Sequence, residues 1–404
     1  MSRRVRFAAA LCIAAVSAVL LAARGVPATP VDSGSNGLVV HEWGTFTSVA
    51  GADGQAVSWY PLSGGSDLPC FVRMLNPNGI KALVSGLPAV RATVRMETPV
   101  IYFYAEQETT ARVFVRFPQG LISEWYPAAT VEPVFLPADA ADATGTIHWP
   151  RVTIRPGPDP AFPREPGDSH YYPARETDAS PVVVDGQAEK FLFYRGLAGF
   201  PVTVQARVDA DGRIALTNTG SHPLERLILF QNIDGRMGYR VLPALEGETT
   251  VEMPELAADF ESLAAGLTQM LVAEGLYRRE ARAMVETWRD SWFEEGTRLM
   301  YLVPRADVDR ILPLTVSPAP DQVVRTFVGR VEIITPAMQD EVEQALLRND
   351  LATLNRCGRL LQPIVDSIRS RPALAGRQDD IDSLLRLIAA SSTPENLCPA
   401  PAGR

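Results

Sequence analysis

Apolar and polar residues alternate along most of the chain between residues 38 and 252. Because a period of two places successive side chains on opposite faces of a strand, this pattern predicts a β-rich region. Asp-Gly pairs separate several of the alternating runs, as tight turns between strands do. Strands are expected at residues 38–51, 91–104, 111–117, 121–126, 146–155, 190–195, 201–208, 213–218, 224–233, 238–242 and 249–252.

A Pro-Gln-Gly turn separates two of these runs, which predicts a hairpin over residues 111–126. In such a hairpin Glu124 would face Phe114 on the partner strand. Arg112 and Arg116 would then be the diagonal neighbours of Glu124, within reach of its carboxylate. The pattern favours a cross-strand ion pair over a catalytic acid at Glu124.

After residue 253 the apolar period changes to 3.6, which is typical of helices with one buried face. Pro254 suits the first position of a helix, and a second helix places Ala281, Met284, Trp288 and Trp292 on one stripe. Further elements are expected as a strand at 298–303, a short helix at 304–312, a strand at 323–334, a helix capped by Thr335-Pro336, and helices over 350–392.

These patterns predict an α+β fold with two domains. An antiparallel, sandwich-like β-rich domain would span residues 38–252, and a smaller helix-rich α/β domain would span 253–395. Residues 396–404 would form a loose tail. The helical half contains no nucleophile elbow, phosphate loop or dinucleotide fingerprint.

The first residues have the pattern of an export signal. An arginine-rich start precedes an apolar run from Phe7 to Ala23, and small residues follow at Val26-Pro27-Ala28. Residues 1–28 are therefore predicted to be a signal peptide. The apolar run is shorter than the ~20 residues of a typical membrane span. We expect a periplasmic or secreted protein without a membrane span.

The charge balance narrows the classes of partner. The net charge is −9 at pH 7, and residues 1–28 carry four arginines and no acidic residue, so their removal would leave −13. An acidic chain without a basic run argues against binding to nucleic acid or to anionic membrane surfaces. A small molecule, a polymer or a protein partner of the envelope remains possible, and the oligomeric state stays open.

Three cysteines follow the leader. Cys357 and Cys398 both fall in the helical part, so they are predicted to form a disulfide in an oxidising compartment. Cys70 is then left over among apolar neighbours and is interpreted as a buried, inert thiol.

The opening strand contains an unusual set of polar residues. Its alternation places His41 and Trp43 on one face and Glu42 on the other. His41 and Glu42 therefore point apart. One hypothesis is a histidine-centred site on a rigid strand. The alternative is a core-edge histidine bonded to a backbone carbonyl, with Glu42 paired to an arginine on a neighbouring strand.

A long proline-rich loop is the second candidate. Residues 155–181 contain seven prolines and two glycines, and their apolar residues follow neither the strand period of 2 nor the helix period of 3.6. Structureless loops of more than ~12–15 residues in a compact domain are usually functional or disordered, and the aromatic residues Phe162, Tyr171 and Tyr172 argue against disorder. The segment is either a binding loop or lid that presents His170, or a surface loop pinned by its aromatic residues.

We place the candidate site where the opening strand and this loop would meet. All four histidines precede residue 223, so the helical half lacks a neutral-pH base of that type. The catalytic candidates are His41, Glu42, Glu97, His170 and Tyr171. If a metal binds, His41, His148 and His170 would be its ligands, and zinc or another divalent ion would suit imidazole.

Three segments resemble a known group of proteins. They are HEWGTFTSVAG at residues 41–51, METPVIYFY at 96–104 and FVGRVEIITP at 327–336. Together they resemble a group of exported proteins from environmental bacteria to which no activity is assigned. The resemblance covers roughly residues 38–340 and implies export. It supplies no catalytic residue, substrate or cofactor.

Two functional hypotheses follow. The first is an exported hydrolytic or metal-assisted enzyme that acts on an envelope or extracellular polymer, and it rests on the histidines of the strand and the loop. The second is a non-catalytic β-sandwich module that binds polysaccharide or an envelope partner, and it rests on the lack of a complete catalytic constellation. Histidines that converge in space would favour the enzyme, and scattered histidines would favour the module.

Overall fold

The computed structural model describes residues 37–62, 68–75, 90–134 and 137–391, all of which belong to one compact unit. The predicted signal peptide and the predicted tail lie outside these residues. Within the described ranges, no helix is long and apolar enough to cross a membrane. A sheet-rich region is followed by a helical part, so the fold is α+β, as predicted.

The strands agree closely with the alternating runs. They are β1 (Val39–Ala50), β2 (Arg73–Met74), β3 (Val94–Tyr104), β4 (Thr109–Pro118), β5 (Gly120–Tyr126), β6 (Thr130–Glu132), β7 (Thr144–Ile154), β8 (Val182–Val184), β9 (Gln187–Glu189), β10 (Leu192–Ala198), β11 (Val204–Val208), β12 (Ile214–Asn218), β13 (Leu227–Ile233), β14 (Arg236–Leu242), β15 (Glu248–Val251), β16 (Gly296–Leu302), β17 (Leu314–Ser317) and β18 (Gln322–Ile333). Only β17 and the two- and three-residue strands have no counterpart in the sequence prediction.

The helices follow in the second half of the chain. They are α2 (Phe260–Ala273), α3 (Arg278–Thr287), α4 (Arg289–Trp292), α5 (Arg305–Ile311), α6 (Pro336–Arg348), α7 (Leu351–Arg356), α8 (Leu361–Ile368) and α9 (Gln378–Ser391), with short 3₁₀ turns η1 (Ala140–Asp142), η2 (Pro173–Arg175), η3 (Gly358–Leu360) and η4 (Pro372–Leu374). Thr335 caps α6 through its side chain, as predicted. Pro254 does not begin α2; Asp259 does, because its carboxylate accepts the Ser262 backbone N–H.

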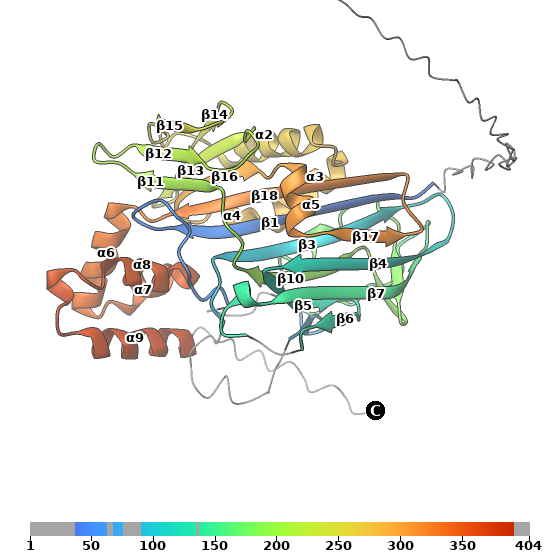
Figure 1. Ribbon diagram of the computed structural model, residues 1–404, viewed down its shortest axis with the longest axis horizontal. Helices are drawn as coiled ribbons and strands as arrows, with labels where there is room; N and C mark the ends of the chain where they lie inside the picture. Colours follow the sequence, from blue (N-terminus) through green and yellow to red (C-terminus); the bar gives the residue numbers. More distant parts are fainter. Residues whose placement is uncertain (1–36, 63–67, 76–89, 135–136, 392–404) are drawn as a thin grey trace, which may run out of the picture. The chain divides into compact units, whose positions relative to one another are not determined.

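One mixed sheet organises the molecule. Its main path runs β14-β13-β16-β18-β1-β3-β10-β5-β7-β4-β17, and β11, β12 and β15 form a second, three-stranded sheet. Strand β1 pairs in parallel with β18 and antiparallel with β3. In Figure 1 the blue β1 therefore lies beside the orange β18, although the two are far apart in sequence. The boundary predicted near residue 252 falls inside this sheet, since β16 and β18 sit between β13 and β1.

The three motif segments are the three neighbouring strands β18, β1 and β3. Their pairing explains why one of their residues, Gly44, is a glycine. Gly44 lies where the register between β1 and β3 shifts, and a Cβ atom there would approach Phe327 to 2.8 Å and the Cα of Pro99 to 3.1 Å. Glycine is required because neighbouring strands come too close for any side chain.

The predicted hairpin over residues 111–126 is wrong in its pairing. The turn exists, but β7 lies between β5 and β4 in the sheet. Phe114 faces His148 on β7, and Glu124 faces Arg195 on β10. Glu124 therefore does not pair with the arginines of β4. Alternation determines which face a side chain occupies, but it does not determine the partner strand.

The cysteines also differ from expectation. Cys357 is a free thiol, so the predicted Cys357–Cys398 disulfide is wrong. Cys70 is disulfide-bonded rather than an inert thiol, and its partner lies outside the described residues. The apolar neighbours of Cys70 in the sequence indicate that it is buried, but they do not reveal a disulfide partner that is distant in sequence.

Peptide mapping without reduction is expected to recover Cys357 as an alkylated thiol and Cys70 in a cross-linked peptide. Such a bond would stabilise the fold by about 2–4 kcal/mol. Free alkylation of Cys70 in the folded protein would contradict this assignment.

Candidate functional site

His41 is sealed inside the protein. Its side chain is fully buried, and its Nδ1 lies 2.7 Å from the Glu280 carboxylate on α3. The rings of Tyr277 and Tyr104 pack on it at 4.6 and 5.2 Å between centroids. The contact is with a carboxylate from the helical half, not with the backbone carbonyl of the alternative hypothesis. His41 thus positions helix α3 on the sheet, and solvent does not reach it.

Glu42 has a structural partner, as the alternative hypothesis held. Arg325 on the neighbouring strand β18 donates to its carboxylate at 2.5 Å, and the Tyr194 hydroxyl donates to its other oxygen. Arg325 also binds Asp309 of α5 at 2.8 Å. His41 and Glu42 point to opposite faces of the sheet, as alternation predicted. Glu42 acts as one member of a buried ion pair rather than as a free carboxylate.

The three histidines proposed as metal ligands do not form one group. His41 is on β1 and His148 is on β7, with β3, β10 and β5 between them. His148 packs against Phe114 at 5.9 Å, and His170 lies in the proline-rich loop. Across the described residues, no three His, Cys, Asp or Glu side chains converge to hold a metal ion. We therefore derive no metal chemistry from them.

Glu97 belongs to an ionic network that the sequence analysis did not identify. The Thr47 hydroxyl donates to Glu97 at 2.8 Å, Arg95 lies 3.6 Å away, and Arg359 of η3 binds it directly. Burial is the largest influence on the pKa of Glu97 and raises it, but the arginines and the hydroxyl outweigh burial and lower this pKa to about 2. Glu97 is a permanent anion and cannot act as a general acid near neutral pH.

The same network ties the sheet to the helices beyond it. Arg330 binds Ser291 at 2.5 Å and Glu294 at 2.6 Å, and it also pairs with Glu332. Arg298 pairs with Glu332 at 3.1 Å. Most of these side chains come from the three motif segments or from strands next to them. Their placement explains the charged motif residues as structural anchors.

The proline-rich loop is pinned by a buried ion pair. Arg175 donates two hydrogen bonds to Glu189, at 2.9 and 2.6 Å. The rings of four aromatic residues surround the Arg175 guanidinium at 5.1–5.8 Å. Tyr171, a proposed catalytic residue, is buried and donates to Glu189 at 3.0 Å, and burial raises its pKa well above the ordinary value. Tyr171 is therefore an anchor of the loop and not an acid–base group at neutral pH.

His170 is placed differently from the other candidates. It is half-buried and lines a cleft of about 990 Å³ between the loop and helix α3. Its Nδ1 lies 3.2 Å from the Thr287 carbonyl oxygen. Because a carbonyl can only accept, Nδ1 must donate, which leaves the lone pair of a neutral ring on Nε2. His170 is the histidine best placed to meet a ligand.

We call this space the loop–helix cleft. Helix α3 presents two faces, with Glu280 turned toward His41 and an exposed stripe turned toward the cleft. The cleft is lined by Arg164, Asp168, Ser169, His170, Tyr172, Pro173 and Glu176 from the loop, and by Arg279, Arg282, Ala283, Glu286, Arg289 and Asp290 from α3 and the segment after it.

The charges of the cleft are partly uncommitted. Arg279 pairs with Asp178 at 2.5 Å, and the Arg164 guanidinium lies 4.7 Å from the centre of the Tyr172 ring. In contrast, Arg282 on the helix has no carboxylate partner among the described side chains, and neither Asp168 nor Glu176 on the loop has a cationic one. Donors and acceptors therefore face the same exposed space.

The opening strand and the proline-rich loop both contact helix α3, which connects them. His41 contacts Glu280 and His170 contacts Thr287, seven residues further along α3, which is about 10 Å of helix. The sequence analysis missed Glu280. The only sequence signal for Glu280 was weak, namely its position three residues after Tyr277, as in a capping box. In the structure the Tyr277 N–H donates to the Glu280 carboxylate at 2.9 Å.

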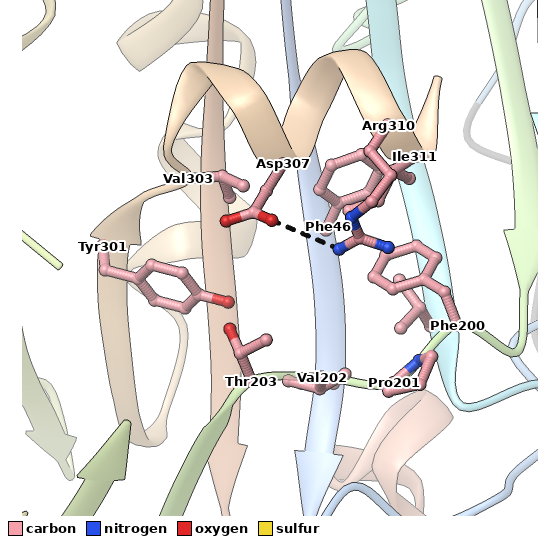
Figure 2. Close-up of a pocket in the computed structure, with 12 residues that line it drawn as sticks. Phe46, Phe200, Pro201, Val202, Thr203, Tyr301, Val303, Asp307, Arg310 and Ile311 are labelled. Atoms are coloured by element: carbon pink, nitrogen blue, oxygen red, sulfur yellow. Dashed lines mark hydrogen bonds and ion pairs between the residues drawn. The ribbon is translucent and has the colours of Figure 1, made fainter. Parts of the chain in front are cut away.

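A small cavity elsewhere is too small for a ligand. Figure 2 shows it beneath α5, where Asp307 and Arg310 pair, and the Tyr301 and Thr203 side chains point toward one another. Its volume is about 20 Å³, which admits about one water molecule. His222 contacts Asp307 at 3.3 Å at this surface.

Comparisons with family models and with curated proteins find no match for this chain.

Proposed function

We propose that this protein is an exported binding protein that holds a segment of polysaccharide in the loop–helix cleft. The observation that supports this best is the cleft of about 990 Å³ with uncommitted donors and acceptors on its two walls. The arginine-rich leader pattern and the resemblance to exported proteins support the compartment. Peptide mapping of protein taken from the periplasm or the medium tests export. We expect no peptide from residues 1–28, and recovery of such peptides would contradict cleavage of the leader.

The charge pattern favours hydroxyl groups over a highly charged ligand. A sugar hydroxyl both donates and accepts hydrogen bonds. It can donate to Asp168 and Glu176 and accept from Arg282, so one uncharged polymer satisfies both walls. A polyanion would be attracted by Arg282 but repelled by the two carboxylates. A polycation would be attracted by the carboxylates but repelled by Arg282.

Replacing Arg282 by alanine is expected to weaken binding about tenfold, since a hydrogen bond from a charged group contributes about 1.5–3 kcal/mol. Immobilised neutral, amino-sugar and uronic-acid oligosaccharides identify the ligand, and calorimetry then gives the dissociation constant. Because hydroxyl contacts carry no net charge, affinity for a neutral oligosaccharide should change little between about 0.1 and about 1 M salt.

Arg278→Ala is the matched control. Arg278 is an exposed arginine on the same helix, and it does not line the cleft. Its removal should leave the dissociation constant unchanged. The proposal is rejected if no oligosaccharide binds, or if Arg282→Ala and Arg278→Ala bind equally well.

A second candidate function is hydrolysis of the bound polymer, with His170 as the base. The orientation of its ring by Thr287 favours it, because a fixed tautomer keeps Nε2 free to accept a proton. Chain shortening of a bound oligosaccharide tests this function. His170→Gln should then bind but not shorten the chain, and absence of shortening by the wild type rules out hydrolysis.

A further inference from the structure

A separate pocket lies between the sheet and the C-terminal helices. Its walls come from the end of β13, the start of β16 and the helices α6 and α7, and its volume is about 480 Å³. That volume lies within the range of small-molecule sites, about 300–1,000 Å³. It has no lining residue in common with the loop–helix cleft, so a ligand here does not depend on the proposed polysaccharide.

The body of this pocket is apolar and adaptable. Met253 and Met338 contribute flexible thioether side chains, which adjust to ligands of irregular shape. Leu360 and Ile364 add branched apolar groups from the C-terminal segment, and Ile233 of β13 is 40% exposed there. An alkyl chain fits such a lining because it needs no polar partner and can follow the methionines.

One polar acceptor in the pocket wall lacks a partner. The Asn232 Nδ2 donates to the Phe293 carbonyl at 2.9 Å. Its Oδ1 is buried and has no hydrogen-bond partner among the described residues. A buried acceptor without a donor is unfavourable, but protein atoms cover this one, so it does not contact a ligand in the pocket directly.

The charges around the pocket favour a cation. Its lining contains four carboxylates and one arginine. Arg356 is already paired with Glu341 at 2.6 Å, and Glu294 is paired with Arg330 at 2.6 Å. The Glu295 carboxylate has no cationic partner within the described ranges. An anionic head group would meet the unpaired Glu295 carboxylate, and the one lining arginine, Arg356, is already paired.

We propose that this pocket binds a single-chain amphiphile with a protonated amine head. The ammonium group pairs with the Glu295 carboxylate, while the alkyl chain packs along Met253 and Met338. This binding site is an addition to the proposed polysaccharide cleft and does not rest on it.

Cys357 provides a reporter inside the pocket. It lines the cavity as a free, half-buried thiol, whereas Cys70 is in a disulfide and does not react. Burial raises the pKa of the Cys357 thiol to about 11. Alkylation is therefore slow at neutral pH, and its rate becomes measurable in mildly alkaline buffer.

The test measures the rate at which N-ethylmaleimide alkylates Cys357 in the full chain, by mass spectrometry. Decylammonium, below its micelle concentration, should slow alkylation about fivefold at a few times its dissociation constant. Decyl sulfate has the same chain and the opposite charge, and it should have almost no effect. Equal protection by both amphiphiles, or by neither, overturns the proposal.

Two variants separate the head-group contact from general acidity. Glu295→Gln keeps the backbone carbonyl that binds Arg298 but removes the carboxylate, so it should weaken protection by decylammonium about threefold or more. Glu246→Gln removes an exposed carboxylate outside the pocket and should have no effect. Circular dichroism confirms that each sample remains folded. Identical protection in the two variants also overturns the proposal.

Discussion

Replacing Glu97 by glutamine is expected to lower the free energy of unfolding by about 3–5 kcal/mol at pH 7, the usual cost of breaking a buried ion pair. Glu97 is 1% exposed and binds Arg359, with Arg95 and Arg330 close enough to affect its charge. A neutral side chain there would leave the three guanidinium groups without their central anion. Unfolding in urea, followed by tryptophan fluorescence, gives the difference.

The same carboxylate is expected to make the protein sensitive to acid. Its pKa falls from an ordinary 4.5 to about 2 in the folded protein. Because the folded-state pKa is the lower one, the stabilisation is complete above the unfolded pKa and is lost as the pH falls from about 4.5 toward about 2. The free energy of unfolding of the glutamine variant should therefore decline less over this interval than that of the wild type.

Glu108→Gln is the control for a carboxylate at the surface. Glu108 pairs with Arg155 at 3.4 Å, but its side chain is 66% exposed. Exposed pairs contribute about 0–1 kcal/mol, so this variant should unfold much like the wild type. A double-mutant cycle with Arg359→Gln measures the coupling to the C-terminal helices. If the Glu97 and Glu108 variants are equally stable, the ionic network does not stabilise the fold as argued.

Local patterns predicted the elements better than their assembly. Alternation found β1, β3 and most other strands, because a half-buried or buried strand needs apolar residues at regular positions. Strand β1 is buried on both faces because Trp43 packs in the core with α2 and α3, and Phe46 packs in the core with α5. The β1–β18 pairing joins residues about 280 positions apart, and no local feature reports such a contact. The domain boundary near residue 252 was predicted from the change of apolar period, and the structure adds that β16 and β18, which follow it, belong to the same sheet as β1.

Side-chain partners were predictable in kind but not in identity. Alternation placed Glu42 opposite His41, and an arginine on a neighbouring strand was one expected partner; Arg325 has that role. The Glu280 partner of His41 lies 239 residues away on a helix, so sequence spacing could not reveal it. Likewise, the aromatic content of the proline-rich loop indicated pinning, while Glu189, the anchor of Arg175, was not identified.

Replacing Arg175 by alanine is expected to lower the free energy of unfolding by about 3–5 kcal/mol and to remove ligand binding at the loop–helix cleft. Arg175 is the link between the loop wall and Glu189 of β9. Without it, Tyr171 and its neighbours lose the cation at their centre, and the loop residues that line the cleft lose their fixed positions. Hydrogen exchange of residues 164–176 should accelerate in step with the loss of affinity.

Two further variants separate charge from geometry. Arg175→Lys keeps the positive charge but cannot form the planar, two-bonded contact with Glu189 or stack on several rings, so an intermediate loss is expected. Arg155→Ala removes an arginine at the start of the same loop whose side chain is 57% exposed, and it should change neither stability nor exchange. If Arg175→Ala keeps wild-type exchange and affinity, the ion pair does not hold the loop.

The pH dependence of the Arg175→Ala variant identifies the cause of its instability. Burial raises the pKa of Glu189 even when Arg175 is present, and loss of the guanidinium should raise that pKa further. A carboxylate with a raised folded-state pKa destabilises the protein above its unfolded pKa of about 4.5 and has no such effect below it. The stability deficit of Arg175→Ala should therefore be smaller at about pH 4 than at pH 7. A deficit that is the same at both values would mean that lost packing around the four rings, and not the uncompensated Glu189 charge, causes the instability.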